Sequence, residues 1–188
     1  MDLGPLPSRE GDEREPRLLL DELHRLRIPR PAAPNIALRM RAAAADPRGR
    51  TIASRLVIDD GTLPRLAAAS LALYASTDDF TALHAVTACY AARALVPFVD
   101  IPTLVGNLWS ALVAAYLSAG SPALLDEAGL EAMRCSAAPA WPEIARRATE
   151  TDDDHVSKIV WSCLAEDRTY GDPLYRAVAW RVAERGSA

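Results

Sequence analysis

Hydrophobic residues recur along this chain with the three- and four-residue spacing that is typical of amphipathic helices. Leucines share one face of residues 16–27, where Pro16 suits a first helical turn. The same kind of pattern, rich in alanine and leucine, continues through residues 63–76, 77–96 and 102–119. The sequence lacks sustained alternation of polar and apolar residues, and residues 51–58 are only a weak strand candidate. The pattern therefore predicts an all-α fold.

Prolines, glycines and capping residues divide the chain into helices. Asn35 is expected to cap a second helix, which ends before residues 46–50. The segment that closes at Gly120 is apolar almost all round, so we place it in the middle of the bundle. After a long connection with one short helix, further helices are expected at residues 142–149, 153–166 and 173–185. We predict a compact single-domain bundle of seven or eight helices over residues 16–188, preceded by a mobile tail at residues 1–15.

Composition and charge narrow the classes of function. The 188 residues are long enough for one domain with a real core, and aromatic residues are only 6% of the chain, which favours closely packed helices. A net charge of -4 with scattered arginines argues against a nucleic-acid-binding surface. The sequence shows neither an apolar run of about 20 residues nor an apolar start of signal-peptide type. We therefore expect a cytoplasmic protein with no nucleic-acid partner and no membrane association.

The common catalytic and metal-binding motifs are missing from the sequence. It contains no glycine-rich phosphate loop, no GxSxG elbow and no HExxH helix. The three cysteines Cys89, Cys135 and Cys163 have no CxxC spacing, so they indicate neither a disulfide framework nor a zinc site. We expect them to be buried free thiols.

The chain has three histidines, and His84 lies in the helical stretch "DFTALHAVTACY". It falls on the same side of that helix as Leu83 and Thr87. A histidine in such a place is often a core residue with one satisfied hydrogen bond. A functional role for His84 requires a second polar group that faces it.

The second group is "TDDDHVSK", which holds His155 and Lys158, the only lysine among 21 lysines and arginines. The acidic run is a good helix start, and the apolar neighbours predict that His155 and Lys158 border the core. A semi-buried amine can act as a base or nucleophile. It can also take up carbon dioxide and become a carbamate, an oxygen ligand suited to non-haem iron. The alternative is a lysine that packs its stem and keeps its head in water.

His24, on the first predicted helix, either completes a triad of imidazoles or lies on the surface. Four aromatic residues could line a pocket for a flat hydrophobic ligand, although such residues often serve as core anchors. They are Trp109, Tyr90, Trp161 and Phe80.

Two stretches of the sequence resemble the questin oxidase-like family over about residues 62–182. "DFTALHAVTACYAARALVPF" is similar to the family phrase around a central histidine, and "DDDHVSKIVWSCLAEDRTYGDPLYRAVAWR" is similar to its closing segment. The resemblance implies a helical oxygenase that inserts oxygen next to a ring carbonyl of an anthraquinone-like polyketide and opens the ring. It implies that His84, His155 and carbamylated Lys158 are metal ligands, while His24 matches no family motif.

The chain is about half as long as the usual family member and lacks histidines of the family's N-terminal half. It therefore has a reduced site, completes one as a homodimer or with a partner subunit, or has lost catalysis. Our first hypothesis is a small oxidoreductase, an oxygenase with non-haem iron that acts on a small hydrophobic aromatic substrate. The alternative is a non-catalytic helical accessory protein that binds a pathway intermediate or a partner subunit. A third hypothesis is cofactor-free catalysis with His155 as a base toward an acidic phenol.

Overall fold

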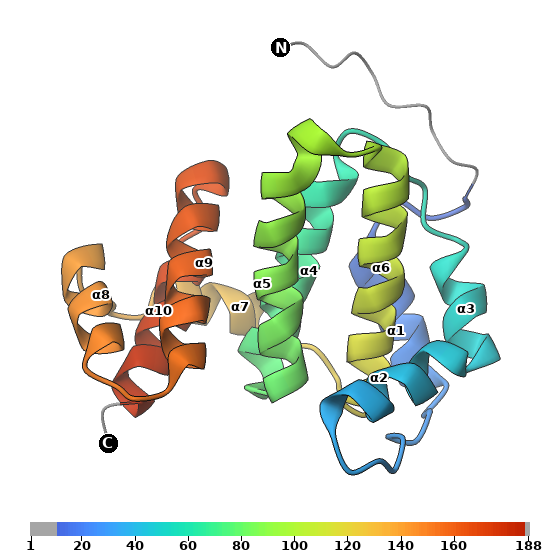
Figure 1. Cartoon of the computed structure of the whole chain (residues 1–188), viewed down its shortest axis with the longest axis horizontal. Coiled ribbons are helices and arrows are strands. Elements are labelled where there is room, and N and C mark those ends of the chain that lie inside the picture. The colour runs from blue at the N-terminus through green and yellow to red at the C-terminus, as the bar shows by residue number, and fades with distance from the viewer. Residues whose placement is uncertain (1–10, 187–188) are drawn as a thin grey trace. The chain divides into compact units, whose positions relative to one another are not determined.

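The computed structural model describes residues 11–186 of the chain (Figure 1). These residues form ten α-helices, one 3-10 helix and no strand beyond an isolated bridge between Glu13 and Leu56. The prediction of an all-α fold is confirmed, with more helices than the seven or eight expected. The elements are α1 (Pro16–Arg25), α2 (Ile36–Ala45), α3 (Pro47–Ala53), α4 (Thr62–Thr77), α5 (Phe80–Leu95), η1 (Val96–Phe98), α6 (Ile101–Ser118), α7 (Glu127–Arg134), α8 (Trp141–Thr149), α9 (Asp154–Tyr170) and α10 (Leu174–Arg185).

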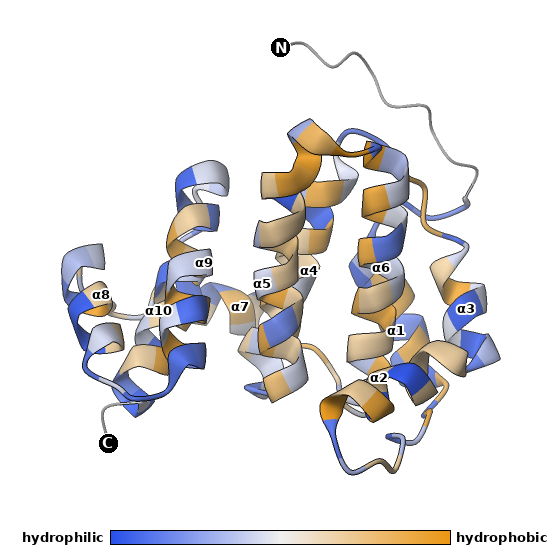
Figure 2. Cartoon of the chain, viewed as in Figure 1, coloured by the Kyte–Doolittle hydropathy of each residue, from blue (hydrophilic) through white to orange (hydrophobic). Residues whose placement is uncertain are grey.

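The chain divides into two compact units between Leu124 and Leu125. The first unit holds α1 to α6 and the second holds α7 to α10. Hydropathy also differs between the elements, because apolar residues run along much of α5 and α6 whereas α8 is largely polar (Figure 2). Each unit therefore has a helical core of its own, and the two are described separately.

Helix α6 is the centre of the first unit. It packs against α2, α3, α4 and α5, and it buries Trp109, Tyr116 and Leu117 almost completely. The prediction that this segment lies in the middle of the bundle is confirmed. Within residues 11–186, α6 is the single helix long and apolar enough to cross a membrane, and 56% of it is buried as in a core helix.

Short aspartate caps explain where several helices begin. Asp79 accepts a hydrogen bond of 2.7 Å from the Thr81 amide at the start of α5. Asp46 accepts one of 2.9 Å from the Arg48 amide and starts α3, a helix that the sequence analysis missed. The pair of Asp46 and Pro47 ends α2 but also supplies the cap and first turn of α3, which is the reason for the error.

The described part of the predicted N-terminal tail is held in place. The Asp12 amide donates to the Arg55 carbonyl over 3.0 Å, and the Val57 amide donates to the Glu13 carbonyl over 2.7 Å. The Asp12 carboxylate also pairs with the Arg55 guanidinium at 3.0 Å. These contacts tie residues 12 and 13 to the segment after α3, residues 1–10 lie outside the described residues, and the mobility of residues 1–15 stays a prediction.

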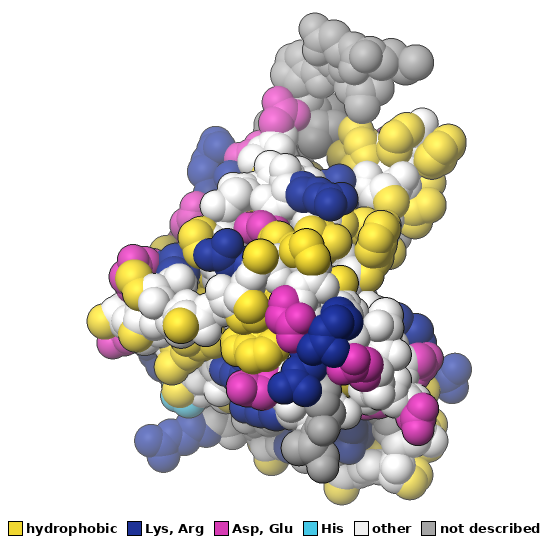
Figure 3. Space-filling model, turned by 90° about the vertical axis from the view of Figure 1, so that its left-hand side faces the viewer, with side chains coloured by type: hydrophobic (Ala, Val, Ile, Leu, Met, Phe, Trp, Pro, Cys, Tyr) yellow, Lys and Arg dark blue, Asp and Glu magenta, His cyan; other side chains and the backbone are white. Residues whose placement is uncertain are grey.

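In the second unit, α9 and α10 pack along each other and α8 covers both. Ile144, Ile159 and Val178 are fully buried between these helices. Helix α9 ends at Tyr170, four residues later than predicted. It is capped by Gly171, whose φ of 69° is a left-handed conformation that glycine adopts without strain. On the face shown in Figure 3, basic side chains lie among acidic ones, so this face is not a uniformly basic patch.

Candidate functional site

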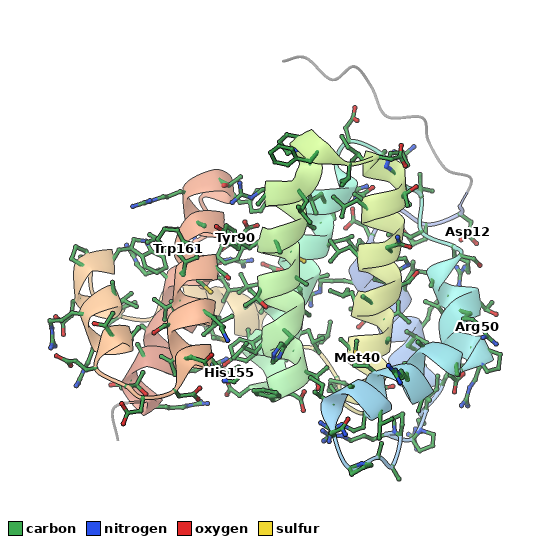
Figure 4. The ribbon with its side chains drawn as sticks, viewed as in Figure 1. Asp12, Met40, Arg50, Tyr90, His155 and Trp161 are labelled. Carbon is green, nitrogen blue, oxygen red and sulfur yellow. The ribbon has the colours of Figure 1, made fainter. Side chains whose placement is uncertain are left out.

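The first unit contains an apolar groove of about 320 Å³ over α6, between α2 and α5. Eleven described residues line it, and they come from these three helices. They are Ile36, Ala37, Met40, Thr81, His84, Ala85, Ala88, Leu108, Ala111, Leu112 and Ala115. Met40 marks the α2 wall of the groove in Figure 4. The volume lies at the lower end of the range of roughly 300–1,000 Å³ that is usual for small-molecule sites.

The helical repeat explains why these positions form one surface. The α5 residues stand at positions 81, 84, 85 and 88, and the α6 residues at positions 108, 111, 112 and 115. This i, i+3, i+4, i+7 spacing places each set along one face of its helix. Five of the eleven residues are alanines, whose short side chains leave space between α2 and α5 where larger residues would close it.

Two of the lining residues, Thr81 and His84, carry polar side chains, and both lie on α5. Thr81 is 1% exposed, and its hydroxyl is buried without a hydrogen-bond partner among the described residues. His84 is exposed at the edge of the groove. The two residues are three positions apart, so their side chains are neighbours on one helix face.

The backbone of α5 fixes the tautomer of His84. Its Nδ1 lies 2.8 Å from the Phe80 carbonyl oxygen, which can only accept, so Nδ1 carries the proton. The neutral imidazole then bears its lone pair on Nε2. The Phe80 ring meets the imidazole edge-on, with 4.6 Å between ring centroids, and helps to hold its orientation. His84 is thus a positioned proton acceptor beside an apolar groove.

His155 and Lys158 lie in the second unit, at the start of α9. His155 Nδ1 is 2.9 Å from an Asp153 carboxylate oxygen and 3.2 Å from an Asp154 carboxylate oxygen. The Lys158 ammonium is paired with the other Asp154 oxygen. Hydrogen bonds from His155, chiefly from its backbone amide, lower the pKa of Asp153, and the bond from Lys158 lowers the pKa of Asp154.

The expectation that Lys158 is semi-buried is wrong. Its side chain is 59% exposed, while that of His155 is 31% exposed. The apolar neighbours Val156, Ile159, Val160 and Cys163 are buried, as expected. At 3.6 residues per turn, Lys158 lies about 150° from the centre of that buried stripe, so it faces away from it.

The contacts at the start of α9 do not fit an iron site. The Lys158 side chain is paired with the Asp154 carboxylate, and a carbamate would replace this attraction by the repulsion of two neighbouring negative charges. Asp153, Asp154 and His155 do bring ligand atoms within 4.8 Å of one another. However, the Asp153 oxygen that lies near His155 Nδ1 also caps the helix, because it accepts a hydrogen bond from the His155 amide. The positive end of the helix dipole at this place disfavours a cation. These residues are better explained as a cap and a surface ion pair.

His24 lies at the end of α1 and is exposed. Its Nδ1 is 2.8 Å from the Ser121 carbonyl oxygen, a contact that ties α1 to the segment after α6. Because a carbonyl only accepts, this contact also places the proton on Nδ1. His24 and His84 belong to the first unit and His155 to the second, and a shared ligand role for the three remains a prediction.

The four aromatic residues proposed for a pocket have different environments. Trp109 is buried and donates a hydrogen bond of 3.1 Å to the Ala53 carbonyl, and it lines a second cavity of about 220 Å³ between α2, α3 and α6. Phe80 and Trp161 are exposed and Tyr90 is half-buried, with the Arg93 guanidinium 5.8 Å from its ring centre. None of the four lines the apolar groove. Figure 4 shows Tyr90 on α5 and Trp161 on α9.

The cysteines are free thiols, as predicted, but one of them is not buried. Cys89 and Cys163 are buried, whereas Cys135 is exposed at the end of α7. The neighbouring Glu131 carboxylate accepts a hydrogen bond from the Cys135 thiol and raises its pKa. Burial raises the pKa of the Cys163 thiol. Neither environment favours a reactive thiolate.

Sequence reasoning identified His84 but missed Thr81 and the α2 wall. Thr81 is the second residue of α5, two positions after the Asp79 cap, and its sequence position does not show that its hydroxyl is buried without a partner among the described residues. Ile36, Ala37 and Met40 come from a short alanine-rich helix far from α5 in sequence. The i, i+3, i+4, i+7 pattern shared by residues 81–88 and 108–115 was the available signal.

The fold and the groove define an all-α protein with a ligand-sized apolar site and one ionisable group at its edge. A model of the questin oxidase-like family matches residues 61–163, more than half of the chain. The chain belongs to this family, and the family resemblance is confirmed. The match covers α5 and α6 of the groove and ends within α9, before the end of the resemblance at residue 182. Comparisons with curated proteins and with solved structures found no match.

Proposed function

We propose that this protein is an oxygenase of natural-product metabolism that oxidises or ring-opens a small aromatic polyketide bound in the groove. The observation that supports the proposal is the pairing of an apolar, ligand-sized surface with His84, the one ionisable side chain among the eleven described lining residues. A flat apolar ligand fits such a surface, and the family description names an oxidase.

The proposed reaction consumes one molecule of dioxygen and one of a reductant for each substrate. One atom of dioxygen is inserted next to a ring carbonyl: the bond between the carbonyl carbon and its ring neighbour breaks, and two carbon–oxygen bonds form. The other oxygen atom leaves as water after taking two electrons and one proton, as a hydride, from a reduced nicotinamide and a second proton from the solvent. Hydrolysis of the resulting lactone then opens the ring.

The residues of the groove contribute binding and proton transfer. The apolar walls of α2, α5 and α6 hold the ring system and displace water from it. His84 Nε2 accepts the proton of a ring hydroxyl, and the resulting phenolate is more electron-rich toward oxygen than the phenol. The Phe80 carbonyl stabilises the imidazolium through its hydrogen bond from Nδ1.

The proposal is tested by turnover of hydroxyanthraquinones with a reduced nicotinamide under ¹⁸O-labelled dioxygen. We expect a product that carries one labelled oxygen atom before hydrolysis. His84→Ala should lower the turnover rate about a hundredfold or more, as loss of a general base does, while the ligand still binds. His155→Ala, in the other unit, is the matched control and should leave turnover unchanged.

Two other outcomes would change the assignment. Binding in the groove without turnover, with or without the reductant, would favour the alternative that the protein is a non-catalytic accessory protein for a pathway intermediate. Absence of any binding by aromatic ligands would contradict both functions.

A further inference from the structure

The cavity between α2, α3 and α6 is separate from the apolar groove. It has a volume of about 220 Å³ and shares no lining residue with the groove. On α6 the cavity is lined by positions 106, 109, 110, 113 and 114, whereas the groove is lined by positions 108, 111, 112 and 115. At 3.6 residues per turn, these two sets are centred on opposite faces of the helix. The cavity is therefore a second candidate ligand site in the first unit.

The size and the walls of this cavity suit one small ring. Its apolar lining includes buried residues from the segment after α3 and from α6, namely Leu56, Ile58, Trp109 and Val113. An apolar cavity of about 150 Å³ is large enough for a benzene ring. A volume of about 220 Å³ thus leaves room for a ring and one further small group.

Arg50 is the one charged residue among the thirteen described lining residues. It lies in the last turn of α3, where Figure 4 labels it, and it is exposed. Its guanidinium makes no hydrogen bond or ion pair with another described residue. Arg48, two positions earlier, is by contrast bound to both carboxylate oxygens of Asp46, over 3.0 and 2.7 Å. Arg50 therefore keeps its donors for a ligand.

The other polar side chains of the lining already donate their hydrogens to the backbone. Trp109 donates to the Ala53 carbonyl over 3.1 Å. The Ser54 and Ser110 hydroxyls donate to carbonyls of α3 and α6 over 2.8 and 2.9 Å. Among the described lining residues, an anionic group of a ligand would thus be bound by the Arg50 guanidinium.

The chain around the cavity is basic, although the protein as a whole is acidic. Residues 23–58, which include α2 and α3, hold eight arginines and one acidic residue, Asp46, in a chain of net charge -4. Three of these arginines pair with a carboxylate among the described residues: Arg30, Arg48 and Arg55. The local excess of positive charge favours an anionic ligand over a neutral one.

We propose that the cavity between α2, α3 and α6 binds an aromatic monocarboxylate with a single ring. The ring fills the apolar part of the cavity, and the carboxylate accepts two hydrogen bonds from the planar guanidinium of Arg50. A phosphate ester would bring a second negative charge, for which the described lining offers no second cation. The inference goes beyond the proposed function, because it concerns another face of α6 and another class of ligand.

Benzoate and benzamide test the proposal, because they have nearly the same size and benzoate alone is charged at pH 7. Each is titrated into the ¹⁵N-labelled full-length protein, and the indole N–H resonance of Trp109 reports binding at the cavity. We expect benzoate to bind about fivefold or more tightly than benzamide, the value of an exposed ion pair of about 1 kcal/mol.

Three substitutions examine the parts of the site. Arg50→Gln removes the charge at an exposed position, so it should fold normally and lower the affinity for benzoate to that for benzamide. Arg50→Lys keeps the charge without the planar fork and should retain part of the preference. Ala44→Leu adds three carbon atoms at an exposed position of the lining and should weaken both compounds about tenfold.

Two matched controls should leave benzoate binding unchanged. Arg41→Gln removes an exposed arginine of α2 outside the cavity, and Ala88→Leu changes the groove. Equal binding of benzoate and benzamide, or equal weakening by Arg50→Gln and Arg41→Gln, would refute the role of Arg50. If neither compound shifts the Trp109 resonance at millimolar concentration, the cavity is not the proposed site. The proposed function would be untouched by that result, because turnover of hydroxyanthraquinones tests it at the groove.

Discussion

In this protein, the contacts that a side chain already makes decide which further interactions it can form. The Lys158 ammonium is paired with Asp154 at an exposed position, and His155 is held by two carboxylates. His84 donates from Nδ1 to its own helix and keeps Nε2 as the acceptor beside a groove. The sequence pointed to all three residues, but its spacing alone could not separate a capping group from a catalytic one.

Substitution of Lys158 by arginine tests this distinction. Arginine can form the same ion pair with Asp154, so we expect Lys158→Arg to change the free energy of unfolding by less than about 0.5 kcal/mol. Turnover should also stay at the wild-type level. Urea unfolding and the labelled-oxygen assay measure the two quantities. A folded Lys158→Arg protein without turnover would show that the reaction requires the lysine amine, as the sequence analysis predicted.

At the scale of elements, helix starts and ends were predictable because they depend on local chemistry. Asn35 caps α2 with a hydrogen bond of 3.0 Å from the Leu38 amide, as expected. The groove was not predictable, because an alanine on an inward face is compatible both with tight packing and with open space. Only the distance between α2 and α5, which is set by how both pack on α6, decides between the two.

Filling the groove should abolish binding without harming the helix. Ala88→Leu adds three carbon atoms to the α5 wall, so we expect a hydroxyanthraquinone to bind at least about tenfold more weakly. Stability should be unchanged or higher, because the added carbons are shielded from water. Ala94→Leu, at an exposed position of α5 outside the groove, is the control and should bind normally. Titration calorimetry and thermal unfolding measure the effects, and normal binding by Ala88→Leu would place the ligand elsewhere.

The cap of α9 should make the second unit sensitive to acid. The pKa of Asp153 is lowered in the folded state from its usual value of 3.8. Its contribution to stability is therefore present above that value and is lost as the pH falls through the lower, folded value. In Asp153→Asn, which keeps a capping oxygen, thermal unfolding should depend less on pH below about 4. Circular dichroism melting curves test this, with Asp152→Asn as the control, and identical acid profiles for Asp153→Asn and wild type would contradict it.

At the scale of the whole molecule, the chain was expected to form one domain, and the structure divides it into two compact units. Composition could not reveal this division, since both units use the same alanine- and leucine-rich helices. The groove and its two polar residues belong entirely to the first unit. The family match nevertheless extends into the second unit as far as residue 163.

A fragment of residues 1–124 tests how independent the first unit is. We expect it to remain helical and to bind a hydroxyanthraquinone with the affinity of the full chain, because every described groove residue is present. Circular dichroism and titration calorimetry are the measurements. A fragment that is unfolded would support the single domain predicted from the sequence. A folded fragment that does not bind would show that residues 125–188 contribute to ligand binding.

The groove has one side inside the family match and one side outside it. Thr81 and His84 lie within the family-matched residues 61–163, whereas Ile36, Ala37 and Met40 lie outside them. The side that carries His84 can therefore stay constant while the opposite side is exchanged. A library that varies only positions 36, 37 and 40 would reshape the groove for ligands of different outline, and the protein would serve as a scaffold with one interchangeable wall.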